Sequence, residues 1–309
     1  AASDVYKRQE EGFAKAGKLR SEFVIAVTGK LEKRGGAVNE NLATGELEVR
    51  AESLRILSES ETPPFPIEEH IQTRDELRLK YRYLDLRNPA VKSNIILRCQ
   101  VVSALRAAMT QHGFLEITTP ILTASSPEGA RDYLVPARKH PGKFYALPQA
   151  PQQFKQLLMT SGFDRYFQIA PCFRDEDARG DRSPGEFYQL DMEMAFASQE
   201  DVFAVLEDVL PPVFEKFGTY KTASKAPFCR ISYKDAMEKY GTDKPDLRID
   251  LLVQDATECM ADCGFGPFEG NVVKAVVADG FKGTRKVIDK LCADVEVQAG
   301  NKAVSYTHL

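Results

Sequence analysis

The sequence predicts an α+β fold in which an antiparallel sheet is the central element. Two strand patterns, Arg165–Arg174 and Glu186–Phe196, flank a loop that contains Pro184 and Gly185, which is typical of an antiparallel hairpin. Between Ile95 and Met109, apolar residues recur every three or four positions, as they do along one face of a helix. Because the strand patterns and the helical spacing of apolar residues occur in separate segments, a mixture of helices with an antiparallel sheet is expected.

An alternating pattern near the N-terminus predicts short strands. Phe23, Ile25 and Val27 alternate with smaller residues, and a second alternating run follows Leu47. An isolated hairpin is marginally stable, so these strands are expected to be part of a small β-barrel over residues 10–62. The Pro-rich residues 62–66 then indicate an extended linker, which we place at 63–80.

Further elements are expected along the rest of the chain. One helix is predicted over Thr73–Leu86, with Asn88-Pro89 as its break, and Gly113 is expected to end the next helix. A strand is expected at Phe114–Leu122, a helix from Pro151, and a helix from Ser198 that Pro211-Pro212 disturbs; a Gly-punctuated αβ pattern begins near Ile249.

Composition narrows the class of protein. The 309 residues carry a net charge of −4, so any contact with RNA is expected to be local. No apolar run approaches the ~20 residues that a membrane helix needs. The six cysteines lack C-x-x-C spacing, which favours reduced, buried thiols in a cytoplasmic protein, and the closest pair, Cys259 and Cys263, has no partner ligands for a metal site.

The two ends differ from their neighbours in pattern. Residues 1–9 and 304–309 are interpreted as non-native flanks and are excluded from the fold. The chain is therefore expected to be a fragment truncated at both ends.

The segment from Cys172 to Phe196 carries the strongest chemical signal. Side chains alternate across a strand, so Phe187, Gln189, Asp191 and Glu193 are predicted to share one face, while the intervening apolar residues form a core face. Arg174 is expected on the adjoining strand. An arginine, carboxylates and an aromatic ring suit an amino acid plus a nucleotide, whereas the alternative is a solvated polar face with salt bridges.

These residues resemble a known family. Phe173-Arg174-x-Glu176, a loop, and Glu186-Phe187-x-x-x-Asp191 resemble motif 2 of class II aminoacyl-tRNA synthetases, with wording similar to the bacterial aspartyl type. Further resemblances cover the entry to the catalytic domain (79–87), motif 1 ending at Pro120 (113–120), the substrate lid (127–133), the amino-acid pocket (144–155) and a later signature (240–248). The similarity extends from about Glu10 to Ala303.

The resemblance implies a domain order. Residues 10–62 would be part of an OB-fold anticodon-binding barrel, 63–80 a hinge, and 81–248 the first part of a class II antiparallel-sheet catalytic core. Residues 249–303 would be part of a bacterial-type inserted α/β domain. An OB fold binds single-stranded RNA with stacking and basic side chains, for which Arg20, Lys30, Lys33 and Arg34 are candidates; the alternative is a solvated charged surface.

The implied activity is that of an aspartate–tRNA ligase. ATP activates L-aspartate to aspartyl-adenylate, and the aspartyl group then passes to the 3′ end of tRNA. Such catalysis consists mainly of positioning and charge neutralisation. A homodimer through the segment around Pro120 and a cytoplasmic location are implied as well.

The resemblance also assigns roles to individual residues. Arg174 would bridge the α-carboxylate and the α-phosphate and is the expected catalytic residue. Asp175, Glu176 and Phe187 would bind ATP, with Glu176 at the adenine amino group and Phe187 stacked on the base. Glu128, Gln152 and Asp191 would bind the substrate ammonium, Lys155 its side-chain carboxylate, and Gln189 would line the pocket.

Some features depart from the family pattern. Ala150 stands where a Ser often occurs, Ser183 where some members have Gln, and Gly185 is extra. The Gly-rich third motif, further aspartate-binding residues and the Mg²⁺ ligands are expected downstream of Ala303, so this chain alone is expected to be inactive.

Two alternatives remain. One is an asparaginyl- or lysyl-type relative, although Lys155 argues for an acidic substrate side chain against lysine. The other is a non-catalytic paralogue that binds only RNA or a metabolite.

Overall fold

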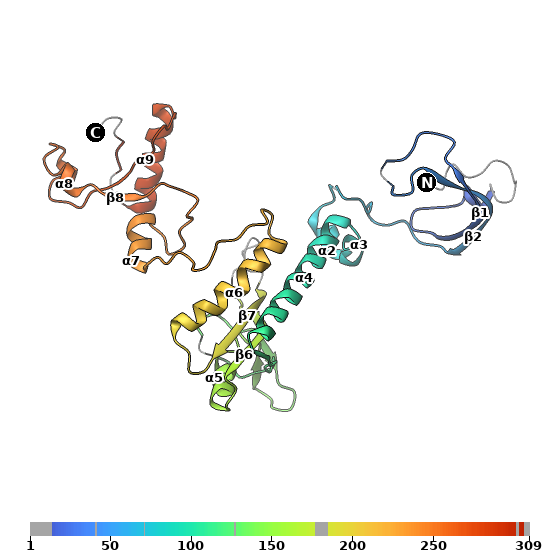
Figure 1. The fold of residues 1–309 in the computed structure, drawn as a ribbon, viewed down its shortest axis with the longest axis horizontal. Coiled ribbons are helices and arrows are strands. Elements are labelled where there is room, and N and C mark those ends of the chain that lie inside the picture. The colour runs from blue at the N-terminus through green and yellow to red at the C-terminus, as the bar shows by residue number, and fades with distance from the viewer. Residues whose placement is uncertain are drawn as a thin grey trace. The chain divides into compact units, whose positions relative to one another are not determined.

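The computed structural model describes residues 14–40, 42–70, 72–126, 128–176, 185–300 and 303–305 (Figure 1). The predicted flank 1–9, most of the flank 304–309, and the loop residues 177–184, which include Ser183, lie outside the described residues. The chain divides into two units, residues 1–202 with 212–222 and residues 203–211 with 223–309.

The N-terminal region contains an antiparallel hairpin. Strand β1 (Val24–Lys33) pairs with β2 (Leu47–Ser58), with register shifts at Val24/Ile25 and Thr28/Gly29. Leu54 is buried, whereas Val24 and Val27 on the partner strand are exposed. The predicted strands are therefore present as a two-stranded sheet within the described residues.

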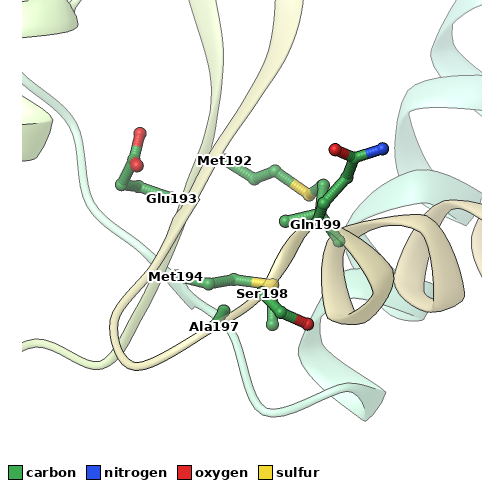
Figure 2. A pocket seen from close by; sticks show the side chains of 7 residues that line it. Met192, Glu193, Met194, Ala197, Ser198 and Gln199 are labelled. Carbon is green, nitrogen blue, oxygen red and sulfur yellow. The ribbon is translucent and has the colours of Figure 1, made fainter.

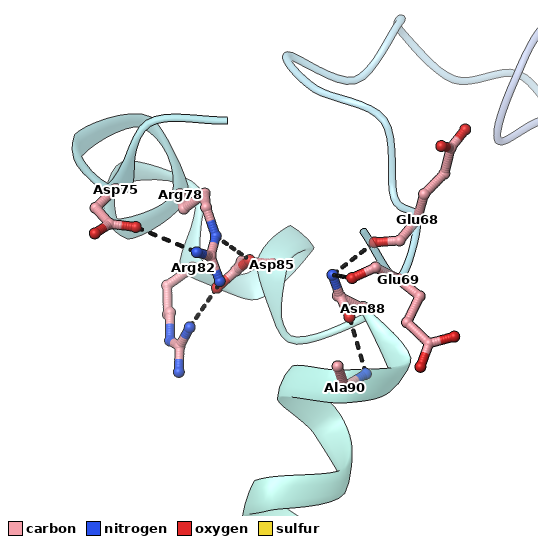
Figure 3. Close-up of polar contacts among 8 residues, drawn as sticks. All are labelled: Glu68, Glu69, Asp75, Arg78, Arg82, Asp85, Asn88 and Ala90. Carbon is pink, nitrogen blue, oxygen red and sulfur yellow. Dashed lines mark hydrogen bonds and ion pairs between the residues drawn. The ribbon is translucent and has the colours of Figure 1, made fainter. Parts of the chain in front are cut away.

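Two short helices follow the linker where one helix was predicted. They are α2 (Asp75–Lys80) and α3 (Arg82–Asp85), and Tyr81 separates them with φ −111° and ψ 46°. The carboxylate of Asp85 is 1% exposed and accepts hydrogen bonds from Arg78 and Arg82 (Figure 3). The prediction of one continuous helix was wrong because the chain turns at Tyr81 so that Asp85 meets the two arginines.

Asn88 begins the long helix α4 (Pro89–Gln111). Its Oδ1 accepts a hydrogen bond from Ala90 N at 2.9 Å, and Pro89 occupies the first turn, where its missing N–H costs nothing. Its Nδ2 donates to the carbonyl oxygens of Glu68 at 2.6 Å and Glu69 at 3.3 Å (Figure 3). Asn88 therefore both caps the helix and holds the preceding linker.

The predicted apolar face of α4 is only partly buried. Met109 is fully buried, and Val102 and Leu105 are half-buried. Ile95 is 44% exposed and Cys99 is also exposed. The helix ends as predicted, since Gly113 follows it with φ +78°.

Within the described residues, the central sheet has three strands. β3 (Leu115–Glu116) runs parallel to β6 (Arg165–Phe173), which pairs antiparallel with β7 (Glu186–Met194). β3 is shorter than the predicted Phe114–Leu122. Beyond it, the side chain of Gln168 takes over the pairing, accepting from Thr119 N at 3.3 Å and donating to Thr119 Oγ1 at 2.8 Å.

A second small sheet and the helices α5 and α6 lie on either side of the central hairpin in the chain. β4 (Leu134–Pro136) pairs antiparallel with β5 (Phe144–Ala146), and α5 (Gln152–Thr160) follows as predicted. The predicted capping box of Ser198 and Asp201 begins α6 (Gln199–Phe217). The prediction that Pro211-Pro212 disturbs this helix was wrong, because α6 continues through both prolines.

The second unit shows the expected αβ pattern. It contains α7 (Tyr233–Asp235), a π-helical turn (Ala236–Tyr240), β8 (Val253–Asp255), α8 (Thr257–Met260), a 3-10 turn (Gly266–Phe268), β9 (Lys274–Val276) and α9 (Arg285–Ala299). β8 and β9 are antiparallel, and Ala256, Met260 and Val273 form a small core.

All six cysteines are free, but their burial differs from the expectation. Cys172 is buried, whereas Cys99, Cys229, Cys259 and Cys263 are exposed. The expectation of buried thiols was therefore wrong for most of them.

Candidate active site

The pairing of β6 with β7 collects the predicted polar residues on one face. Cys172 lies opposite Phe187, Ala170 opposite Gln189, and Gln168 opposite Asp191. Directly opposed residues point to the same side of an antiparallel pair.

Arg174 lies on this face as well, two positions beyond Cys172. Its guanidinium carbon is 5.0 Å from the centroid of the Phe187 ring, within cation–π range, and both side chains are half-buried. A guanidinium and a ring thus border one surface.

Lys155 projects from α5 onto the acidic part of the same face. Its Nζ lies 2.9 Å from Asp191 Oδ1 and 3.3 Å from Glu193 Oε2, and the Lys155 and Asp191 side chains are 13% and 10% exposed. Burial lowers the pKa of Lys155, but the hydrogen bond and charge of Asp191, with the charge of Glu193, outweigh it and raise the pKa. Lys155 is therefore a fixed cation at neutral pH.

Two buried polar atoms beside this ion pair have no hydrogen-bond partner among the described residues. They are Asp191 Oδ2 and the hydroxyl oxygen of Tyr166. Burial, followed by the negative charge of Asp191, raises the pKa of the Tyr166 hydroxyl, which stays protonated. Buried polar atoms of native proteins are nearly always paired, so Asp191 Oδ2 indicates a place for a polar ligand or water, whereas the Tyr166 hydroxyl already interacts with Asp191.

Cys172 is a buried residue on this face of the sheet. Its thiol lies 3.4 Å from Gln189 Oε1, and burial raises its pKa to about 11. Such a thiol is a poor nucleophile at neutral pH, so the chemistry of the site rests on charge and positioning.

The remaining predicted residues lie at the edge. Asp175 and Glu176 follow β6 with exposed side chains, and Glu128 and Gln152 are exposed too. The negative charge of Glu128 nevertheless contributes to the raised pKa of Cys172, so Glu128 lies near Cys172. The sheet thus brings Arg174 beside Phe187 and Lys155 beside Asp191. The other four residues, Asp175, Glu176, Glu128 and Gln152, lie at the edge, and none is seen to form a side-chain hydrogen bond with those two pairs.

Sequence reasoning missed the buried amide of Gln149, which holds the segment Ala130–Asp132. Gln149 is 1% exposed; its Oε1 accepts from Ala130 N at 3.2 Å, and its Nε2 donates to Ala130 O at 2.9 Å and to Asp132 Oδ1. Hydrogen bonds from Gln149 and Ser125 lower the pKa of Asp132. A lone amide in the apolar run Phe144–Pro151 was the available signal.

Gly185 is required where the loop returns to β7. Its φ is +87°, and a Cβ would lie 2.8 Å from the hydroxyl oxygen of Tyr133 and 3.4 Å from Arg174 O. The extra glycine of the sequence therefore lets the backbone at residue 185 lie close beside Tyr133.

A separate cavity of about 300 Å³ lies at the start of α6 (Figure 2). Figure 2 shows Met192 pointing toward Gln199 and Met194 toward Ser198, while Glu193 points away from them. The residues around it are Met192, Glu193, Met194, Ala197, Ser198, Gln199 and Val202. None of the predicted site residues is among them, because the two methionines belong to the opposite face of β7.

No group of three or more His, Cys, Asp or Glu side chains in the described ranges is arranged to hold a metal ion. No helix in that part of the chain is long and apolar enough to cross a membrane.

Comparison with known proteins identifies the relatives of the chain. It is 58% identical over 286 residues to the "Aspartate--tRNA(Asp/Asn) ligase" of Zymomonas mobilis, covering 90% of this chain and 48% of that protein. It is 53% identical over 302 residues to the "Aspartate--tRNA ligase" of Agathobacter rectalis, covering 96% and 50%. The chain spans about half the length of the curated relatives it matches.

Solved structures and a family model agree with these matches. Asparaginyl-tRNA synthetase from Pyrococcus horikoshii, solved with asparaginyl-adenylate, aligns with a TM-score of 0.60 and 26% identity, covering 75% of this chain and 57% of that one. The family model "tRNA synthetases class II (D, K and N)" matches residues 74–293. The expected α+β class is confirmed by these neighbours, and the chain belongs to the class II tRNA synthetases of the D, K and N group.

Proposed function

We propose that the protein containing this chain is an aspartate–tRNA ligase, which activates L-aspartate with ATP and transfers it to tRNA. The observation that carries the proposal is the single sheet face on which Arg174 lies 5.0 Å from the Phe187 ring and Lys155 contacts Asp191. The names of the relatives support aspartate as the amino acid.

The nucleotide is assigned to the Arg174 end of this face. Arg174 bridges the α-carboxylate and the α-phosphate, since a guanidinium can donate two parallel hydrogen bonds to such oxygens. Phe187 stacks on the adenine, and Asp175 and Glu176, at the end of β6, complete the ATP site, with Glu176 at the adenine amino group. The exposure of both acidic side chains supports contacts that form only when ATP is bound.

The amino acid is assigned to the Lys155 end. The unpaired Oδ2 of Asp191 supports a role for this residue in binding the substrate ammonium, together with Glu128 and Gln152. Lys155, as a compact cation, binds the side-chain carboxylate of aspartate, and Gln189 lines the pocket. Lysine as substrate would place two ammonium groups beside each other here, which is unfavourable.

Catalysis follows from charge placement. The α-carboxylate attacks the α-phosphate, pyrophosphate leaves, and Arg174 neutralises the negative charge that develops. Mg²⁺ usually accompanies ATP, and the described residues offer no group of three His, Cys, Asp or Glu side chains to hold it.

We further propose three properties of the whole protein. Residues 10–62 form part of an OB fold for the anticodon, followed by the hinge 63–80, the core 81–248 and the insertion 249–303. A homodimer forms through the segment around Pro120, supported by exposed apolar side chains at Leu115, Ile121 and Leu122. The protein acts in the cytoplasm.

The decisive test is pyrophosphate exchange into ATP by the complete protein in which this chain occurs. Exchange should require aspartate and should fail with lysine or asparagine. Exchange driven by lysine but not by aspartate would refute the proposal.

A further inference from the structure

The turn between β4 and β5 concentrates positive charge on a chain whose net charge is −4. Arg138, Lys139 and Lys143 lie within six residues, together with His140, and no Asp or Glu occurs in residues 133–163. All four side chains are exposed. None of them forms an ion pair or a side-chain hydrogen bond with another residue in the described part of the chain. The three cations are therefore available to an external anion.

Backbone hydrogen bonds fix the shape of this turn. Ala137 N donates to Lys143 O at 3.0 Å, and Lys143 N donates to His140 O at 3.0 Å. Ala137 is buried, and Gly142 has a φ of +78°, which glycine adopts without strain. The cations therefore project from a backbone that is already ordered, which lowers the entropy lost when a partner binds.

The β4–β5 hairpin is attached to the edge of the candidate active site. The chain continues from β5 to Pro148, whose carbonyl oxygen accepts from Phe173 N at 2.9 Å, and Arg174 directly follows Phe173. Lys143 precedes Pro148 by five residues, which is ~17 Å at most along an extended chain. A polymer whose end reacts beside Arg174 therefore comes within reach of the turn.

An exposed aromatic ring directly follows the cations. Phe144 is 56% exposed and lies opposite Pro136 in the hairpin. Cations that neutralise phosphates, beside a ring that can stack on a base, are typical of surfaces that bind single-stranded nucleic acid. An acidic protein surface would pair with the cations but would leave the ring without a partner. The combination therefore favours RNA.

We propose that the β4–β5 turn binds the single-stranded 3′ end of the tRNA, with Arg138, Lys139 and Lys143 on its phosphates and Phe144 stacked on a base. The identity of the RNA rests on the proposed function. Contacts to phosphates carry no sequence information, so the turn positions the tRNA end and does not select the tRNA.

The first arm of the test measures the Kd of tRNA for the complete protein at several salt concentrations, by fluorescence anisotropy. The turn variant combines Arg138→Gln, Lys139→Gln and Lys143→Gln. The slope of log Kd against log salt should fall by about 2, since each lost phosphate contact removes somewhat less than one unit. The affinity at low salt should fall by about tenfold or more.

A control variant removes the same charge elsewhere. It combines three exposed lysines at and before the start of α9, changed as Lys282→Gln, Lys286→Gln and Lys290→Gln. Both variants lower the net charge equally, so a difference between their salt slopes reports local contacts. Because the side chains of the turn have no partner in the described structure, the urea midpoint of the turn variant should equal that of the unmodified protein.

The second arm locates the RNA segment. Phe144→Leu keeps an apolar side chain but loses the stacking ring, and should weaken the binding of intact tRNA by about tenfold. A tRNA trimmed of its single-stranded 3′ end should bind the unmodified protein and Phe144→Leu equally. Equal losses with intact and trimmed tRNA would overturn the assignment to the 3′ end.

The remaining outcomes separate this inference from the proposed function. Identical salt slopes in the turn variant and the control variant would overturn the inference. So would vesicles that contain phosphatidylserine, if they displaced tRNA from the unmodified protein and bound the turn variant less well. Failure of aspartate-dependent pyrophosphate exchange in the complete protein would refute the proposed function alone, because the slopes would still decide whether the turn binds RNA.

Discussion

The guanidinium carbon of Arg174 lies 5.0 Å from the centroid of the Phe187 ring, across the β6–β7 pair. On the opposite face of the sheet, Arg98 lies 4.6 Å from the centroid of the Tyr188 ring. The two cation–π pairs have similar geometry but lie on opposite faces of the sheet. Substituting each arginine in turn therefore distinguishes a role of Arg174 in the proposed chemistry from a role in packing alone.

Arg174→Ala should abolish most aspartate-dependent pyrophosphate exchange in the complete protein. We expect kcat/KM to fall by about 10² to 10³, the loss typical of one transition-state donor. Arg174→Lys should recover little, because an ammonium group cannot make the two parallel bonds. Arg98→Ala is the control and should leave kcat/KM within about twofold; an equal loss in both variants would assign Arg174 to packing.

Lys155→Met should destabilise the unit that contains the sheet by about 3 kcal/mol, because it leaves the carboxylate of Asp191 buried without its cation. The measurement is urea unfolding, compared with exposed Gln153→Ala in the first turn of the same helix. The double variant Lys155→Met with Asp191→Asn should recover part of the loss, since no buried charge is left unpaired. Full additivity of the two substitutions would show that the ion pair does not stabilise the fold.

The buried carboxylate of Asp85 should make stability depend on pH in the acid range. Hydrogen bonds from Arg78, followed by its charge and by Arg82, lower the pKa of Asp85 from 3.8, although burial opposes the shift. A lowered folded-state pKa contributes stability that is present above the unfolded value and disappears as pH falls through the folded value. Urea midpoints at about pH 6 and about pH 3 should therefore differ less in Asp85→Asn than in the unmodified chain. An identical difference in both proteins would contradict this prediction.

Asn88 should separate helix capping from linker attachment. Asn88→Ala removes both functions and should cost about 1 kcal/mol through the lost cap. Asn88→Asp keeps an oxygen for Ala90 N but cannot donate to the carbonyls of Glu68 and Glu69. Limited proteolysis of residues 63–74 should accelerate in both variants, while hydrogen exchange at the Ala90 amide should accelerate only in Asn88→Ala, because the Asp side chain still accepts from that amide. Unchanged proteolysis in Asn88→Asp would remove the linker role.

Local sequence signals predicted the elements that are set by residues close together in the chain. The Ser198–Asp201 capping box, the Gly113 stop and the β6–β7 hairpin follow from short-range sequence chemistry. In contrast, the break at Tyr81 depends on side-chain contacts within its own segment that periodicity does not reveal, and the length of β3 depends on a distant partner. Asp85 gathers two arginines, and Gln168 replaces the backbone pairing of Thr119, so neither outcome is encoded in the periodicity of its own segment.

In the candidate site, too, some features could be predicted from the sequence and others could not. Strand alternation sufficed to predict that Phe187, Gln189 and Asp191 share a face, because the period of a strand is fixed by its backbone. It could not predict that Lys155 meets Asp191, or that Gln149 holds Ala130, since these contacts join separate segments.

By itself, therefore, the sequence determined the face of the hairpin on which the guanidinium, the ring and the acids lie, because covalent geometry sets side-chain alternation. Only the tertiary structure decided which cation neutralises Asp191 and which amide supports the lid. Those choices follow from burial, where a charge or a polar group is stable only beside a partner brought from elsewhere in the chain.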